Sequence, residues 1–274
     1  MKTAIQGQQS TVPTASRTLI RTLSSIPDFQ YFVRPSPNPD PDRVLVLVHG
    51  ISRQPSFMLR CLADRADELD YTLIAPVFNH RSYSDYQRLG RDGRGERADL
   101  AFRTMLMDAA VCLGLQGAVH LMGFSGGAQF AHRFVYAHPG VVRSLTLAAA
   151  GWYTAPDGRV RFPYGTAPNR RLPDLNFDIH NLLQTPSLTI VGERDTVRDS
   201  TVRRSPRLDK RQGPNRLARA RWFHRRLKKL AAAEGYGRRH RFCELPRTAH
   251  DFGEAVMRGG LVDLLFDFCE ENVA

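Results

Sequence analysis

Cysteine is scarce in this chain. The only four among 274 residues are Cys61, Cys112, Cys243 and Cys269, and no two of them form a C-x-x-C pair. The sequence therefore suggests neither a zinc site nor a dithiol redox motif. We expect these thiols to be buried and inert.

Long apolar runs are also missing. Residues 1–28 contain no apolar stretch of the kind found in secretory signals, and no later stretch reaches the roughly 18 apolar residues of a membrane span. We therefore expect a cytoplasmic protein with reduced thiols and no membrane span. Residues 1–25 are rich in Ser, Thr and Gln, and we expect them to be partly disordered.

Acidic residues are few in the segment 196–242. It holds 16 Lys or Arg against Asp199, Asp209 and Glu234, an excess larger than the net charge of +12 of the whole chain. Apolar residues recur at helical spacing from Leu217 to Ala231, which predicts an amphipathic helix in a basic helical segment. Its charges are either solvated or form a patch that attracts an anionic substrate, partner or surface. Because the charge is local, we do not expect nucleic acid as a partner.

The order of apolar runs predicts an α/β fold. Val44–Val48 is continuously apolar, as is typical of a strand covered on both faces. Further strands are expected at 30–33, 71–76, 119–123, 144–150, 187–191 and 241–245, and helices at 57–70, 96–113, 128–137 and 251–269. This alternation predicts one domain over 26–274, with a mainly parallel sheet of about seven or eight strands and helices on both faces.

One short motif, Gly123-Phe124-Ser125-Gly126-Gly127, connects a predicted strand to a predicted helix. Glycines on both sides of the serine permit a sharp, strained turn in which the chain passes close to itself. Such a turn holds the serine oxygen out at the top of the sheet, ready to attack. The alternative is a structural serine in a glycine-rich turn.

A carboxylate and an imidazole follow two other predicted strands. Asp195 comes just after strand 187–191, and His250 comes just after strand 241–245. Because functional residues of parallel sheets gather at the carboxyl ends of the strands, we expect both to meet Ser125. Glu193 and Asp199 are alternatives to Asp195, one nearer the strand end and one farther from it. Eight other histidines are alternatives to His250.

The chain order Ser125, Asp195, His250 resembles that of the α/β-hydrolase superfamily, and the resemblance extends over about residues 43–270. Within it, the elbow and the region after residue 150 are most similar to small bacterial esterases of the feruloyl esterase and polyhydroxyalkanoate depolymerase type. Val48-His49-Gly50-Ile51 looks like the oxyanion loop of the superfamily. The resemblance implies that the N–H of Ile51 is one oxyanion donor, and the elbow geometry makes the N–H of Gly126 the other.

These residues predict a serine hydrolase. A Ser-His-Asp catalytic triad would cleave a carboxylic ester through an acyl-enzyme intermediate, without metal or organic cofactor. An amide or peptide hydrolase on the same fold and a non-catalytic polyanion-binding protein are the alternatives.

Five residues are candidates to line the substrate site, and they suit an anionic or aromatic ester: His49, Arg53, Phe124, Trp152 and Tyr153. For His49 the alternative is a structural role in holding the oxyanion loop, and for Arg53 it is a solvated side chain. The prolines of 151–186 predict a short, irregular cap loop. There, Trp152 and Tyr153 could equally anchor that loop to the core.

Overall fold

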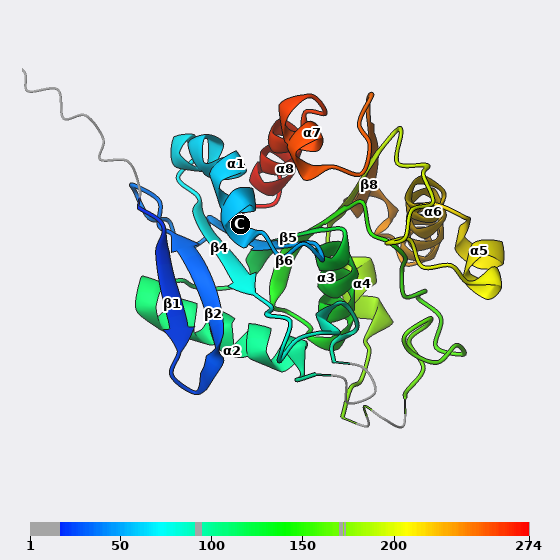
Figure 1. The fold of residues 1–274 in the computed structure, drawn as a ribbon, viewed down its shortest axis with the longest axis horizontal. Helices are drawn as coiled ribbons and strands as arrows, with labels where there is room; N and C mark the ends of the chain where they lie inside the picture. The colour runs from blue at the N-terminus through cyan, green and yellow to red at the C-terminus, as the bar shows by residue number, and fades with distance from the viewer. Residues whose placement is uncertain (1–16, 91–94, 170–171, 173, 274) are drawn as a thin grey trace, which may run out of the picture.

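Eight strands form a single sheet in the computed structural model, which describes residues 17–90, 95–169, 172 and 174–273 (Figure 1). The sheet order is β1-β2-β4-β3-β5-β6-β7-β8. The first two pairs, β1 with β2 and β2 with β4, are antiparallel, and the other five are parallel. The predicted α/β class and mainly parallel sheet are confirmed. The strands are β1 (Leu19–Leu23), β2 (Ile26–Arg34), β3 (Val44–Val48), β4 (Thr72–Val77), β5 (Val119–Phe124), β6 (Val142–Ala148), β7 (Ser187–Gly192) and β8 (His240–Leu245).

Helices cover both faces of this sheet. On one face α2, α3, α4 and α6 contribute to one hydrophobic cluster, and on the other α1, α7 and α8 contribute to a second. The helices are α1 (Pro55–Glu68), α2 (Ala98–Leu113), α3 (Gly126–Ala137), α4 (Ile179–Gln184), α5 (Pro206–Gln212), α6 (Arg216–Ala233), α7 (Phe252–Met257) and α8 (Leu261–Glu270), with short 3₁₀ turns η1 (Tyr86–Arg88) and η3 (Gly237–Arg239).

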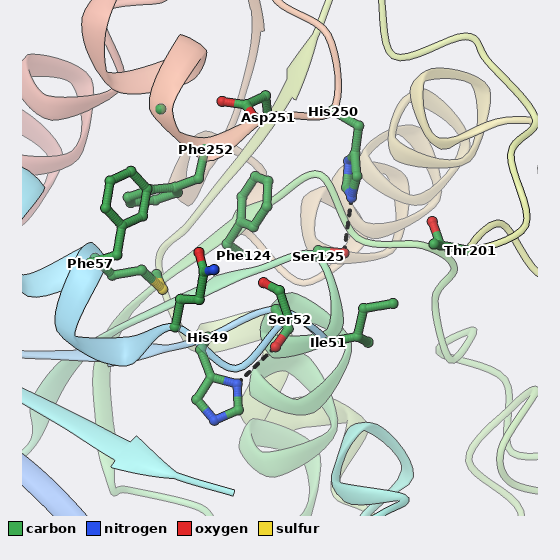
Figure 2. Close-up of a pocket in the computed structure, with 14 residues that line it drawn as sticks. His49, Ile51, Ser52, Phe57, Phe124, Ser125, Thr201, His250, Asp251 and Phe252 are labelled. Carbon is green, nitrogen blue, oxygen red and sulfur yellow. Dashed lines mark hydrogen bonds between the residues drawn. The ribbon is translucent and has the colours of Figure 1, made fainter. Parts of the chain in front are cut away.

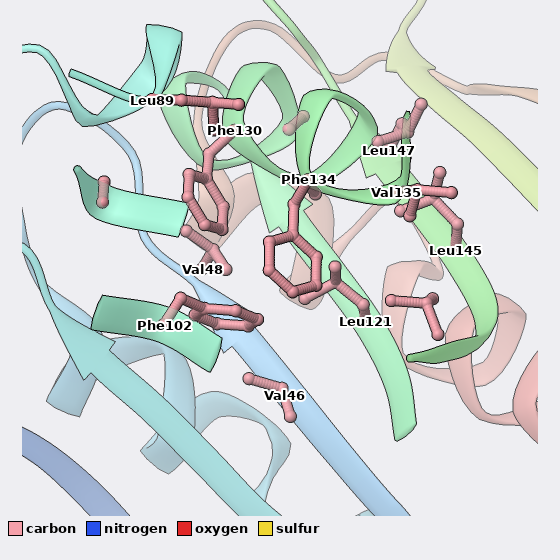
Figure 3. Packing of buried hydrophobic residues seen from close by; sticks show 14 of the residues in the cluster. Val46, Val48, Leu89, Phe102, Leu121, Phe130, Phe134, Val135, Leu145 and Leu147 are labelled. Carbon is pink, nitrogen blue, oxygen red and sulfur yellow. The ribbon is translucent and has the colours of Figure 1, made fainter. Parts of the chain in front are cut away.

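Strand β3 shows why its sequence is apolar throughout. Val46 and Val48 belong to the first cluster, whereas Leu45 and Leu47 point to the opposite face and belong to the second. Alternate side chains of a strand face opposite sides, so a strand in the middle of a covered sheet must be apolar at every position. Figure 3 shows the first cluster, in which aromatic rings of α2 and α3 pack over β3 and β5.

The N-terminal part differs from the sequence expectation. Leu19–Leu23, placed in the segment expected to be partly disordered, form β1 and pair with β2 in a hairpin. Only Leu23 of this strand is buried, so its sequence lacks the apolar signal of a core strand, and pairing with β2 at the sheet edge provides its hydrogen bonds. Residues 1–16 lie outside the described residues.

The predicted closing helix over 251–269 is interrupted. Gly259 and Gly260 separate α7 from α8, and Gly260 adopts a left-handed conformation with φ of 71°. Glycine reaches this region without the steric penalty that other residues incur, and therefore favours a break in the helix.

The basic segment 196–242 is only partly as expected. Its helix α6 buries the predicted apolar face, but Arg216 and Arg219 are buried as well and are not solvated. Among the cysteines, Cys269 is buried, Cys61 and Cys243 are half-buried, and the expectation of burial is wrong for Cys112, which is exposed on α2. Within the described residues, no helix is both long enough and apolar enough to cross a bilayer.

Candidate active site

The turn from β5 into α3 has the strained geometry that its glycines predicted. Ser125 has φ of 53° and ψ of −110°, a conformation that non-glycine residues rarely adopt. A Cβ on Gly123 would lie 2.3 Å from the backbone of Gly127, and one on Gly127 would lie 2.0 Å from the carbonyl oxygen of Val48. Neither position can therefore carry a side chain, and the backbone holds Ser125 at the carboxyl end of β5.

Ser125, His250 and Asp195 form a continuous chain of hydrogen bonds. The Oγ of Ser125 lies 3.0 Å from Nε2 of His250 (Figure 2). The Nδ1 of His250 lies 2.8 Å from Oδ2 of Asp195. Asp195 and Ser125 are buried, with 2% and 7% of their surface exposed. The three side chains predicted to meet at the strand ends therefore do meet there.

The loops that carry Asp195 and His250 are bonded to each other. The N–H of Arg194 donates to the carbonyl oxygen of Thr248 at 2.9 Å, and the N–H of Glu193 donates to that of Leu245 at 2.9 Å. A Cβ on Gly192 would lie 2.3 Å from the Thr248 oxygen, so glycine is required for this approach. The ends of β7 and β8 thus fix the acid and the imidazole relative to one another.

Two acids considered as alternatives have other partners. The carboxylate of Glu193 accepts from the backbone N–H of Arg247 at 3.1 Å. Asp199 lies beside Arg216, with a shortest distance of 3.4 Å. Neither is bonded to His250.

Phe124 lies against the imidazole. Its ring stacks on that of His250 with centroids 5.2 Å apart and 19° between planes, and it meets Phe252 edge-on at 5.3 Å. This packing restricts the rotation of His250 about its side-chain bonds.

The loop after β3 is held by a buried histidine. Nε2 of His49 accepts from the N–H of Phe78 at 3.1 Å, so its proton is on Nδ1, which donates to the carbonyl oxygen of Gly50 at 2.8 Å. Burial lowers the pKa of His49 to about 4, so the ring is neutral at neutral pH. The hydroxyl of Tyr86 also donates to the backbone oxygen of His49, at 2.8 Å. The loop backbone is therefore fixed from two sides.

This loop brings Ile51 against the start of α3. A Cβ on Gly126 would lie 3.0 Å from Cγ2 of Ile51, so the two residues are neighbours beside Ser125. Gly126 is the first residue of α3, where a helix leaves its N–H groups without acceptors. The two residues expected to supply the oxyanion donors are thus neighbours beside Ser125.

Comparisons with known proteins bear on the fold. No family model matches the chain, and no curated protein matches its sequence. The structure of poly(aspartic acid) hydrolase-1 from Sphingomonas sp. KT-1 superposes with a TM-score of 0.75 at 22% identity, over 93% of this chain and 100% of that one. Poly(3-hydroxybutyrate) depolymerase from Bordetella parapertussis gives 0.74 at 24% identity, over 92% and 89%. A ferulic acid esterase gives 0.64 at 15% identity, over 94% and 99%.

The chain has the α/β-hydrolase fold. The sequence expectation is confirmed at this level, and the α/β-hydrolase fold accounts for the meeting of side chains that are up to 125 positions apart in the chain. Its parallel strands β5, β7 and β8 all end at the same edge of the sheet, which brings the three loops together.

Ser125 lies between two pockets at this edge of the α/β-hydrolase fold. The first has a volume of about 410 Å³ and contains aromatic and aliphatic side chains, including Phe57, Met58, Phe124 and Phe252. Figure 2 shows Phe57, Phe124 and Phe252 on one side of Ser125 and Thr201 on the other. The second pocket has a volume of about 290 Å³ and is polar and cationic; it is lined by Ile51, Gln87, Arg88, Ser125, Gln129, Gly151, Trp152, Ser200, Thr201, Arg203 and Arg216.

The candidate lining residues divide between these pockets and the core. Phe124 and the loop residue His49 belong to the first pocket, and Trp152 belongs to the second. Tyr153 is fully buried and stacks on Phe223 at 4.2 Å, so it anchors the cap loop, and its assignment to the substrate site is wrong.

Arg53 was also wrongly expected at the substrate site. Its guanidinium donates to the carbonyl oxygen of Phe78 at 2.6 Å and lies over the ring of Tyr86. It lines neither pocket and instead supports the loop after β3, where it also donates to the carbonyl oxygen of Ile51 at 3.2 Å.

Arg216 is the site residue that the sequence analysis missed. Its Nη1 lies 3.2 Å from Oδ1 of Asp195, and both side chains are 1% exposed. Its Nη2 also donates to the hydroxyl of Thr201. Arg216 is the first residue of α6, and only the N-cap signal of Asn215 indicated where that helix begins. Nothing in the local sequence distinguishes this arginine from the solvated ones that follow it.

Proposed function

We propose that this protein is a serine hydrolase that cleaves a carboxylic ester through an acyl-enzyme intermediate. The unbroken hydrogen-bonded chain from Ser125 through His250 to Asp195 supports this proposal most directly. It gives a nucleophile, a base and an orienting acid in the geometry that this chemistry requires.

The first step would be attack by Ser125. As its Oγ bonds to the ester carbonyl carbon, His250 takes the hydroxyl proton on Nε2. The carbonyl electron pair moves onto oxygen, and then returns to expel the alcohol, which receives the proton from His250. Asp195 would hold the ring and stabilise the imidazolium. Water then attacks the acyl-enzyme with the same proton transfers, and releases the carboxylic acid and free Ser125.

The negative charge on the carbonyl oxygen needs preorganised donors. The N–H groups of Ile51 and Gly126 are our candidates, because they adjoin Ser125 from two directions. Donors held rigidly by the fold need no reorganisation during the reaction, and one such donor is typically worth about 3 kcal/mol in the transition state. The buried bonds of His49 would supply that rigidity.

We propose an ester rather than an amide as the substrate. By their names, two structures of similar fold act on a polyester and on poly(aspartic acid), and the triad chemistry serves both bond types. Paired ester and amide substrates with the same acyl group would determine the preference.

Polyanion binding has less support. Some cations of the basic segment are in ion pairs, among them Arg221 with Glu244 at 2.5 Å and Arg241 with Glu271 at 2.6 Å. Its charge is thus partly neutralised at the surface. Retention on heparin that falls with salt would favour this alternative.

The decisive experiment is labelling with a fluorophosphonate, in which Ser125 Oγ would bond to phosphorus and expel fluoride. We expect mass spectrometry to find the adduct on Ser125. The variant Ser125→Ala should lose roughly 10⁵-fold in kcat on short-chain esters, because serine and its base act as a unit. Ser56→Ala, on α1 and outside both pockets, is the matched control. Labelling elsewhere, or full activity of Ser125→Ala with its circular dichroism unchanged, would refute the proposal.

A further inference from the structure

The second pocket is lined by more positive charge than the neighbouring carboxylates neutralise. Three arginines line it: Arg88, Arg203 and Arg216. Arg88 pairs with Asp85 at 2.5 Å, and Arg216 pairs with Asp195 and Asp199. The charges of Arg88 and Arg216 are therefore largely balanced by carboxylates. Arg203 is the remaining arginine of the pocket.

Arg203 has no acidic partner. Among the described residues no carboxylate lies within ion-pair distance of it. Its guanidinium instead donates to the hydroxyl of Tyr164 at 2.8 Å and lies 5.7 Å from the centroids of both the Trp152 and Tyr164 rings. The side chain is exposed at the pocket wall. Aromatic stacking and one neutral hydrogen bond orient its charge without neutralising it.

A second cation, which has no carboxylate within ion-pair distance among the described residues, lies directly behind the wall. Arg133 of α3 is fully buried and stacks on the ring of Trp152, with its Cζ 4.3 Å from the ring centroid. Trp152 in turn lines the second pocket. Arg133 donates to the hydroxyl of Thr154 and to the carbonyl oxygen of Gln87, which are neutral acceptors. Within the part of the chain that the structure describes, its Nη2 has no hydrogen-bond partner. Its charge therefore adds to the field in the pocket, where low dielectric screens it weakly.

The first pocket has the opposite character. Apart from its histidines, the only ionisable side chain that lines it is the carboxylate of Asp251. An anionic group would be repelled there and would lose its hydration among phenylalanines. An anion therefore favours the second pocket, where Gln87 and Gln129 add amide groups beside the arginines.

We propose that the second pocket binds a carboxylate of the substrate, a few atoms from the scissile ester, while an apolar part of the substrate occupies the first pocket. This inference rests on the proposed function, because both pockets are defined by their contact with Ser125. The proposed substrate is thus an ester with an acidic end and an apolar end. Arg203 is the residue of the second pocket that determines specificity for the acidic end, and Trp152 positions that arginine.

The test compares matched esters with the full chain. Monoethyl adipate against ethyl hexanoate places the carboxylate on the acyl side, and 4-butyryloxybutanoate against butyl butyrate places it on the alcohol side. Hydrolysis is followed in a pH-stat at low and high salt. We expect one acidic ester to exceed its neutral partner about 10-fold in kcat/KM, and added salt to reduce this ratio.

Variants of Arg203 separate charge from shape. Arg203→Gln should lower the acidic-to-neutral ratio about 10-fold, Arg203→Glu should lower it further, and Arg203→Lys should retain part of it. Arg204→Gln, in the same exposed loop but outside both pockets, is the matched control and should keep the ratio of the unmodified protein.

The outcomes distinguish this inference from the proposed function. If all four esters are hydrolysed but neither acidic one is preferred, or if Arg203→Gln and Arg204→Gln change the ratio equally, the carboxylate pocket is refuted while the hydrolase remains. If no ester is hydrolysed and fluorophosphonate does not label Ser125, the proposed function itself fails.

Discussion

The two pockets beside Ser125 share a wall but have opposite chemistry. The first is formed by α1, the elbow and the start of α7, and presents Phe57, Phe124 and Phe252. The second is formed by η1, the cap loop and the segment before and at the start of α6, and presents arginines and amides. Helices α1 and α7 and the end of β5 supply the aromatic side chains of the first pocket, whereas the second takes Trp152 from the cap loop and Arg203 from the segment before α5. The two pockets thus differ in chemistry because different segments supply their side chains.

The largest effect is expected at Arg216, which lines the second pocket and pairs with Asp195. Arg216→Gln removes one partner of a buried ion pair, and we expect a loss of about 3 kcal/mol in the free energy of unfolding. Without its bond to Arg216, the carboxylate of Asp195 is held less firmly toward His250, so kcat/KM for a neutral ester should fall as well. Urea unfolding and kcat/KM at one fixed pH measure the two effects.

Arg219→Gln is the control for Arg216→Gln. Arg219 is also buried in α6 and pairs with Asp209 at 2.8 Å, away from Asp195. It should destabilise the fold comparably while kcat/KM for a neutral ester stays near that of the unmodified protein. An equal fall of kcat/KM in the two variants would show that Arg216 acts through stability alone.

Acid should destabilise the loop after β3, because the buried bonds of His49 hold that loop. Ile51 of this loop lines both pockets. Burial lowers the pKa of His49 to about 4 from an ordinary value of 6.5, so the unfolded chain binds a proton that the folded protein does not. This contribution is fully present above pH 6.5 and is lost as the pH falls toward 4. At pH 5 the loss amounts to roughly 2 kcal/mol, at about 1.4 kcal/mol per pKa unit.

The variant His49→Gln tests this contribution, because the amide oxygen can replace Nε2 as acceptor for Phe78 and does not titrate. We expect its free energy of unfolding to depend less on pH between 7.5 and 5 than that of the unmodified protein. Parallel curves would mean that His49 does not carry the effect. Burial lowers the pKa of His120 to about 4 and that of His132 further, so part of the acid sensitivity should remain in the variant.

The smallest effect is expected in the first pocket. Phe57→Ala removes apolar surface without touching the triad, and should lower kcat/KM for hexanoate or butyl esters about 10-fold relative to ethyl acetate. The acidic-to-neutral ratio governed by Arg203 should not change. A change in that ratio would mean that the pockets are not independent.

Many of the strands and turns were predictable because each depends on a short local sequence pattern. The continuous apolar run of β3 identified a strand buried on both faces, and the glycines around Ser125 identified the turn. The edge strand β1 was missed because its side chains are mostly exposed, so it has no apolar pattern to recognise. The helix after His250 was predicted unbroken because apolar periodicity resumes after Gly260.

Candidate site residues were predictable to different degrees. Ser125, Asp195 and His250 each follow a strand, and strand ends can be read from sequence. Tyr153 and Trp152 are adjacent in the sequence, yet one packs on Phe223 and the other faces a pocket. The two side chains point in different directions because of the path of the cap loop. That path depends on the helices that the loop packs against.

The sequence alone determined most of the order of strands and helices and the three candidate residues Ser125, Asp195 and His250, because each depends on residues within a few positions of one another. The tertiary structure decided that Arg216 would lie on Asp195, that Arg53 would turn away from the site, and that Arg203 would face it without a carboxylate. Burial and ion pairing arise from contacts between distant segments, and a run of arginines looks the same in sequence whether its members are solvated, buried or poised over a pocket.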